Sequence, residues 1–147
     1  DVYKRQSRSR EYKRWQQIVC DVFEDSPAAE KIFEDLWIHF GKPSSWQPVE
    51  QGCCLLETVR EFGVEVAVAS NFDERLLVLA KHIEPLDGIE KIFASSELGW
   101  RKPAPQFFQA VESRLQKEPE SLLLVGDDPR LDIAAANAAG WKSMRIG

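Results

Sequence analysis

The amino-acid sequence predicts an α/β protein, with a parallel sheet flanked by helices and a helical segment before it. From Gly52 to the C-terminal end, short apolar runs alternate with amphipathic helical patterns, which is typical of parallel strands joined by crossover helices. Before Gly52 the apolar residues recur only at helical spacing. Residues 42–52 are rich in Pro, Ser and Gly and indicate a loop or linker. We therefore expect a helical segment over residues 10–48 and an α/β unit over residues 49–147.

Two amphipathic helices are expected in the N-terminal region, over residues 10–23 and 26–41. Ser26 suits a helix N-cap, Pro27 the first helical position and Gly41 a helix stop. The first six residues match no pattern, and residues 1–9 are expected to be unassigned or disordered. The apolar residues form one stripe on each helix: Trp15, Ile18, Val19, Val22 and Phe23 on the first, and Ile32, Phe33, Leu36, Trp37 and Phe40 on the second.

Helices and strands are expected to alternate after Gly52. Gly63 ends the first helix, and the strand after it is dense in Val and ends in small polar residues. The later segments "KIFASS" and "SLLLVGD" are short and apolar, as strands buried in a parallel sheet are. The expected order is helix 53–63, strand 64–71, helix 73–86, strand 91–96, helix 104–116, strand 121–127, helix 130–140 and strand 143–147.

Length and composition exclude several classes of protein. At 147 residues the chain is long enough for one domain with a hydrophobic core. A net charge of −5 gives no basic surface for nucleic acid, and no apolar run approaches the roughly 20 residues of a membrane span. The charged N-terminal segment lacks the pattern of a signal peptide. Cys20, Cys53 and Cys54 fit neither a disulfide framework nor a metal site. We expect a reducing intracellular, cytoplasmic location.

Polar residues gather where the expected strands end. Ser70 and Asn71 follow one strand, Asp127 and Asp128 follow another, and Lys102 lies in the loop before a helix. In open parallel sheets ligands bind outside the carboxyl ends of the strands. Adjacent aspartates suit Mg²⁺, which takes one or two carboxylates together with substrate phosphate, while a lysine offsets phosphate charge. Hydroxyl and backbone N–H groups hold phosphoryl oxygens, so the set suits phosphoryl transfer.

Each of these residues also has a purely structural interpretation. Ser70 suits a helix cap, and Lys102 before a proline suits a solvated loop. Asp127 or Asp128 could cap the helix that begins near Pro129, although one aspartate suffices for that. Asp132 falls in the first turn of the same helix and could act on its dipole. His39 and His82 lie on amphipathic helices without an acidic or nucleophilic neighbour in the sequence, so we expect both to be structural.

Three segments in this order resemble motifs of the haloacid dehalogenase superfamily. They are "VEVAVASNFD", "SSELGWRKPAPQFF" and "LLLVGDDPRLDIAAANAAG", and the resemblance runs from about residue 10 to residue 147. It implies a Rossmann-like sheet in which residues 10–48 are part of a helical cap. It further implies that Ser70, Asn71 and Lys102 hold the phosphoryl group, Ser70 and Lys102 being catalytic. By the same resemblance Asp127 binds Mg²⁺, Asp128 is a second ligand, and Asp132 lies behind the ligands.

The first motif of the superfamily, an Asp-x-Asp segment that supplies the nucleophile, has no counterpart in the sequence. The nearest candidate, "IVCDVFED", reaches Asp21, but Phe23 stands where the second acid belongs and the apolar spacing is helical. Because that motif ends the central strand of the sheet, we expect the first core strand to be missing. Two apolar strands would then have unpaired edges, with low stability, aggregation or direct pairing of these two strands as the consequence.

The sequence therefore predicts a fragment of a hydrolase, an interpretation that the lack of an initiator Met also suggests. The parent protein would be a Mg²⁺-dependent phosphatase that hydrolyses a small phosphomonoester through a phosphoaspartate on an upstream strand. The chain alone would be inactive. The alternative is a degenerate, non-catalytic family member that binds a partner or serves as a scaffold. A receiver-type signalling domain also uses an acidic Mg²⁺ site, but the N-terminal helical pair counts against it. Substrate identity and oligomeric state stay open.

Overall fold

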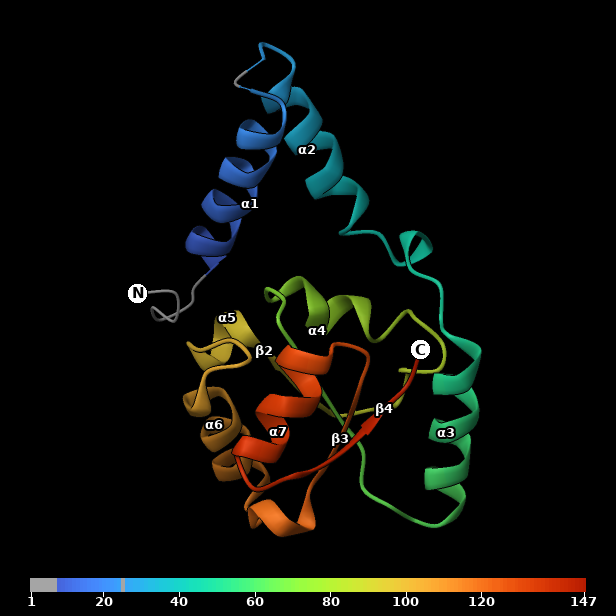
Figure 1. Ribbon diagram of the computed structural model, residues 1–147. Helices are drawn as coiled ribbons and strands as arrows, with labels where there is room; N and C mark the ends of the chain where they lie inside the picture. Colours follow the sequence, from blue (N-terminus) through green and yellow to red (C-terminus); the bar gives the residue numbers. More distant parts are fainter. Residues whose placement is uncertain (1–7, 25) are drawn as a thin grey trace.

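The computed structural model describes residues 8–24 and 26–147 and confirms the α/β class (Figure 1). Most of the unassigned segment, residues 1–7, lies outside the described residues. The α-helices are α1 (Arg8–Val22), α2 (Ala29–His39), α3 (Glu50–Glu61), α4 (Arg75–Leu79), α5 (Ser95–Leu98), α6 (Pro105–Leu115) and α7 (Ala135–Ala138). The strands are β1 (Ala67–Ser70), β2 (Lys91–Ala94), β3 (Leu123–Gly126) and β4 (Lys142–Arg145). Short 3-10 or π segments are η1 (Pro43–Ser45), η2 (Pro119–Ser121) and η3 (Pro129–Ala134).

The strands form two separate parallel pairs. β1 pairs with β2, from Ala67 opposite Lys91 to Ser70 opposite Ala94. β3 pairs with β4 in the same sense, with Gly126 opposite Arg145 at the far end. Among the described residues β1 and β3 are in different sheets. The two strands expected to flank the missing one therefore do not pair with each other, and each keeps one edge without a strand partner in the described sheets.

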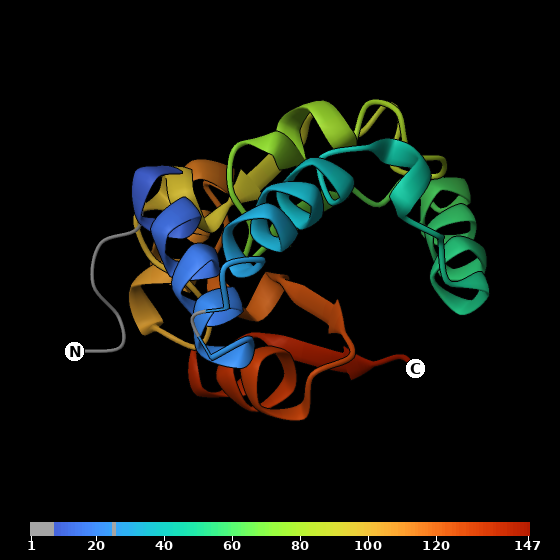
Figure 2. The ribbon, with the colours of Figure 1, turned by 90° about the horizontal axis from the view of Figure 1, so that it is seen from above.

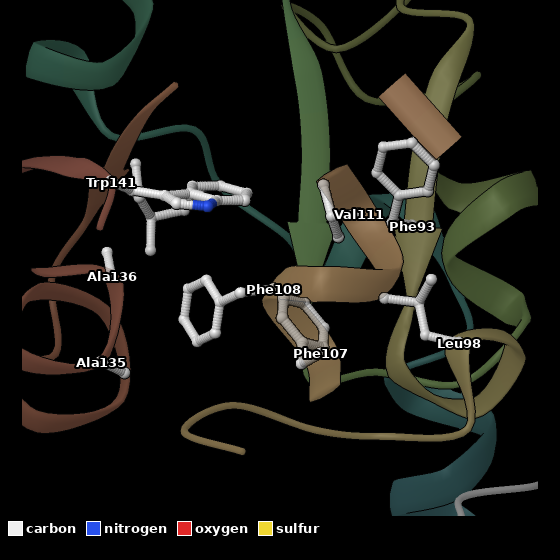
Figure 3. Close-up of a cluster of buried hydrophobic side chains, with 9 residues drawn as sticks. Phe93, Leu98, Phe107, Phe108, Val111, Ala135, Ala136 and Trp141 are labelled. Atoms are coloured by element: carbon white, nitrogen blue, oxygen red, sulfur yellow. The ribbon is translucent and has the colours of Figure 1, made fainter. Parts of the chain in front are cut away.

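A cluster of buried side chains connects the two strand pairs (Figure 3). Phe108 on α6 is 1% exposed. Its ring meets Trp141 edge to face at 5.3 Å and Phe107 at 5.6 Å, an arrangement that aromatic quadrupoles favour. Phe93 of β2 and Leu124 of β3 belong to the same cluster. Burial of apolar surface around α6 thus holds together two sheets that share no backbone ladder.

The α1–α2 hairpin, residues 8–39, stands above the α/β unit on the side of α4 and α5 (Figures 1 and 2). Its two helices meet through aromatic contacts, with the Tyr12 ring 4.8 Å from that of Phe33 and 4.9 Å from that of Trp37. Val19, Ala29 and Phe33 are buried. No helix of residues 8–24 and 26–147 is long and apolar enough to cross a membrane.

Several boundaries differ from expectation: α3 begins at Glu50, the strand expected over residues 91–96 ends at Ala94, and the helix expected over residues 130–140 is divided into η3 and α7. Two further differences have a local cause. Ser26 is not the N-cap of α2. The Ala29 N–H donates to the Ser26 carbonyl at 2.8 Å in a turn before the helix, and α2 begins only at Ala29. The helix expected over residues 73–86 ends at Leu79. Beyond it the His82 N–H donates to the Leu79 carbonyl at 2.9 Å, an i to i−3 bond, and Pro85 disfavours helical backbone at Glu84.

We expect Phe108→Ala to lower the free energy of unfolding by about 3–5 kcal/mol, because it removes the ring that connects the two strand pairs. Urea denaturation followed by circular dichroism measures the effect. Phe62→Ala is the control: Phe62 is 79% exposed, so its loss should change stability by less than about 0.5 kcal/mol. Equal effects of the two substitutions would contradict the bridging role of the α6 cluster.

Candidate functional site

Lys102 lies between the carboxyl end of β1 and the segment after β3, and so connects the two strand pairs. Its ammonium Nζ lies 2.5 Å from Asp132 Oδ1 and 3.4 Å from the carbonyl oxygen of Ala69. Ala69 is in β1, whereas Asp132 lies in η3, just after β3. The side chains of Lys102 and Asp132 are 11% and 8% exposed. One cation therefore lies between the carboxyl ends of two parallel strands, where the sequence analysis expects a ligand site.

The Asn71 side chain fixes the backbone of the loop that contains Lys102. Its Nδ2 donates to the Lys102 carbonyl at 2.9 Å, and its Oδ1 accepts from the Lys102 N–H at 2.7 Å. This reciprocal pair ties the segment after β1 to the loop between α5 and α6. The Asn71 side chain thus positions Lys102. The phosphate contact expected of Asn71 would then come from its backbone N–H.

Asp132 is the acid that the structure brings to Lys102. The whole Asp132 residue is 5% exposed, and its Oδ2 accepts from the Asp128 N–H at 3.1 Å. Gly126 makes room for it: a Cβ at Gly126 would lie 2.4 Å from Asp132 Oδ2. The family resemblance implies that Asp132 lies behind the metal ligands, and no sequence pattern assigns a role to Gly126. A glycine at a strand end, next to a functional loop, is the signal of close approach that could have identified it.

The two adjacent aspartates have different surroundings. Asp128 Oδ1 accepts from the N–H groups of Arg130 and Leu131, at 2.7 Å each, and so caps η3. These backbone hydrogen bonds, that of Leu131 first, hold the pKa of the Asp128 carboxyl below its ordinary value. Asp127 is exposed at the end of β3. The structural interpretation, in which one acid of the pair caps a helix, therefore applies to Asp128.

The remaining candidates are placed at the same edge or away from it. Ser70 is the last residue of β1 and is half-buried, so it lies at the strand exit that Lys102 also reaches. Asp21 lies in the last turn of α1, where it accepts from Gln17 Nε2 at 2.7 Å. It is therefore a helical residue and not the end of a strand, as the apolar spacing indicates. Among the described residues no group of three or more His, Cys, Asp or Glu side chains forms a metal cluster.

We expect Gly126→Ala to lower the free energy of unfolding by about 1–3 kcal/mol, because the new methyl group must displace the Asp132 side chain. Urea denaturation measures this cost. Gly52→Ala is the matched control: the added Cβ would lie 3.7 Å from its nearest neighbour, an ordinary contact, within helix α3, where Ala is preferred over Gly. If Gly126→Ala were no more destabilising than Gly52→Ala, Asp132 would not depend on the close approach.

The lowered pKa of Asp128 predicts a pH-dependent contribution to stability. The carboxylate binds a proton less readily in the folded protein, so its contribution is fully present above the ordinary pKa of 3.8 and is lost as the pH falls through the lowered value. Asn keeps an oxygen for the cap but no charge. The stability difference between the wild type and Asp128→Asn should therefore stay constant above the ordinary pKa of 3.8 and shrink as the pH falls below it. A difference in urea midpoints that stayed constant below that pH would refute this assignment.

Comparison with known proteins identifies the family of the chain. The family model of the haloacid dehalogenase-like hydrolases matches residues 9–140. The chain is 31% identical over 137 residues to the bovine haloacid dehalogenase-like hydrolase domain-containing protein 3, covering 90% of this chain and 55% of that protein. The "SNFD" and "GWRKP" segments indicate the same subfamily from sequence alone. The chain thus spans about half the length of this relative.

Two further similarities are to proteins named as phosphatases. The ribulose-1,5-bisphosphate 5-phosphatase of Halopiger xanaduensis is 32% identical over 90 residues, covering 60% of this chain and 38% of that protein. The crystal structure of a HAD phosphatase from Thermococcus onnurineus has a TM-score of 0.68 at 19% identity, covering 94% of this chain and 67% of that one, and supports the fold. The family match over residues 9–140 and the order of the three motifs lead to one conclusion: the chain belongs to the haloacid dehalogenase-like hydrolases.

Proposed function

We propose that this chain is a fragment of a Mg²⁺-dependent phosphatase that acts on a small phosphomonoester. In this proposal the nucleophilic aspartate comes from an upstream strand that lies between β1 and β3, and the 147-residue chain alone is inactive. Residues 10–48 are part of a cap over the site, and residues 49–147 are the α/β core. The phosphatase names among the relatives support the reaction class.

The position of Lys102 is the observation that carries the proposal. Its ammonium is held at the carboxyl ends of β1 and β3 by Asp132 and by the Ala69 carbonyl, and its backbone is fixed by Asn71. A phosphoryl group at this edge would meet a positive charge that is already oriented. Preorganised charge of this kind lowers the barrier to phosphoryl transfer without reorganisation during the reaction.

The division of the strands into two pairs supports an additional strand. β1 and β3 each belong to a parallel pair, and the residues at and after their carboxyl ends meet at Lys102 and Asp132, yet the two strands belong to different sheets. A strand with unpaired N–H and C=O groups along one edge accepts another strand there. An apolar strand between the two would complete one continuous sheet. If it ended in Asp-x-Asp, a pattern that this sequence lacks, its carboxylates would reach the same edge.

The acids after β3 are compatible with Mg²⁺. Asp127 is exposed at the strand end, and Asp128 uses one oxygen for its cap. Mg²⁺ is bound by one or two carboxylates together with waters and substrate phosphate, so Asp127, with Asp128, would hold it. When bound, the ion would neutralise charge on the phosphoryl oxygens. Ser70 would donate its hydroxyl to a phosphoryl oxygen, and the Lys102 ammonium would offset the negative charge.

The test compares two forms of the protein for Mg²⁺-dependent hydrolysis of an aryl phosphate. One is the 147-residue chain, and the other is the same chain extended into its upstream reading frame where that encodes an apolar strand ending in Asp-x-Asp. We expect turnover only in the extended form. In that form Lys102→Ala should lower kcat/KM by roughly 10²–10³-fold. Lys91→Ala, which removes a lysine that pairs with Glu65 on the surface, should leave it unchanged.

Three results would overturn all or part of the proposal. Robust turnover by the 147-residue chain that is lost in Asp21→Asn would show that the nucleophile is not upstream. Full activity of the extended Lys102→Ala variant would remove Lys102 from the phosphate site. An extended form that folds, carries the Asp-x-Asp strand and hydrolyses no phosphomonoester would favour the non-catalytic alternative, a binding or scaffold protein.

A further inference from the structure

Arg75 makes contacts with both the α1–α2 hairpin and the segment after β1. On one side Nε and Nη2 donate to the two oxygens of Asp73, at 2.8 Å each. On the other side Nη1 donates to the carbonyl oxygen of Trp37 at 2.6 Å, and the guanidinium carbon lies 3.5 Å from the centre of the Trp37 ring. Asp73 is 2% exposed. One planar side chain thus connects residues of α2 with residues that follow Ser70.

The Trp37 carbonyl is a specific acceptor for this cation. Trp37 lies in the last turn of α2, whose final carbonyls have no partner within the helix. The Gly41 N–H, which would continue the ladder to Trp37, instead donates to the Ile38 carbonyl at 3.2 Å. A cation at the C-terminal end of a helix is also favoured by the helix dipole. Arg75 therefore caps α2 from the α/β unit.

The same side chain forms part of the boundary of an apolar cavity of about 170 Å³ between hairpin and core. The hairpin contributes Trp15 and Trp37 to its lining, and the α/β unit contributes Phe72 and Arg75. Phe72 is two residues beyond Ser70, and its carbonyl accepts from Ser95 Oγ at 3.1 Å. The volume of this cavity thus depends on how the hairpin is held over the exit of β1.

We propose that Arg75 is a positioning residue that fixes the α1–α2 hairpin over the exit of β1 and thereby sets the size of the cavity between them. The fork of the guanidinium is essential to this role, because it bonds both Asp73 oxygens and the Trp37 carbonyl while stacking on the indole. A lysine ammonium could neutralise Asp73 but could not make the same set of contacts. Any effect of Arg75 on phosphate hydrolysis rests on the proposed phosphatase function, whereas its effect on the position of the hairpin does not.

The test uses the 147-residue chain and needs no turnover. Hydrogen exchange of the amides of residues 38–42 reports the end of α2, and the tryptophan emission of the chain, to which Trp37 is one of five contributors, reports changes around the cavity. We expect Arg75→Lys to speed exchange of these amides about tenfold or more and to shift the tryptophan emission. Lys31→Met is the matched control on the same helix, since it removes only the exposed pair with Asp35, and it should leave both readouts unchanged.

A second variant separates positioning from charge balance. Arg75→Met alone leaves the buried Asp73 carboxylate without its counter-ion and could unfold the chain. The double variant Asp73→Asn, Arg75→Met removes both charges, so it should fold and still show fast exchange at residues 38–42. The proposal is overturned if Arg75→Lys or the folded double variant keeps wild-type exchange and emission, because Arg75 would then be only a counter-ion for Asp73. This outcome is independent of whether the extended protein hydrolyses phosphate.

Discussion

The ion pair between Lys102 and Asp132 is the contact on which the geometry of the site depends. It joins a loop that follows β2 to a segment that follows β3, in a protein whose described strands form two sheets without a common backbone ladder. Both side chains are largely buried. A buried pair adds little net stability relative to apolar packing, but loss of one partner is costly because the other charge stays desolvated. The role of this ion pair is to fix the positions of the Lys102 and Asp132 side chains.

Each partner of this pair is held by the segment around it, so the pair is not free to rearrange. Asn71 anchors the backbone of Lys102 from the exit of β1. Gly126 lets Asp132 approach the exit of β3 more closely than any side chain would allow. The apolar cluster around Phe108 keeps the two exits at a constant separation. Packing, a side-chain amide and a glycine thus combine to present one ammonium group at a fixed place.

Local patterns in the sequence predicted the elements and the edge of the site, because both follow from near neighbours in the chain. The alternation after Gly52 predicted the strands and most of the helices, but not α5 or the π-helical η3. The polar residues near the strand ends indicated Ser70, Asn71, Lys102 and the acids as candidates, and their roles stay predictions. The choice of acid for Lys102 could not be predicted. Asp128 and Asp132 are four residues apart, and only the π-helical turn of η3 makes one a cap and directs the other back to the lysine. The separation of the sheets is likewise a tertiary result that no local pattern carries.

The three acids after β3 have different contacts, and these contacts decide which carboxylate could bind a divalent cation. The charge of Asp132 is matched by Lys102, and that of Asp128 is stabilised by two backbone N–H groups. Asp127 stands exposed at the strand end. In the proposed phosphatase, Asp127 would therefore be the main ligand of Mg²⁺ among the acids after β3. Because Lys102 and the ion would attract the same phosphoryl group, substrate and ion would strengthen each other's binding.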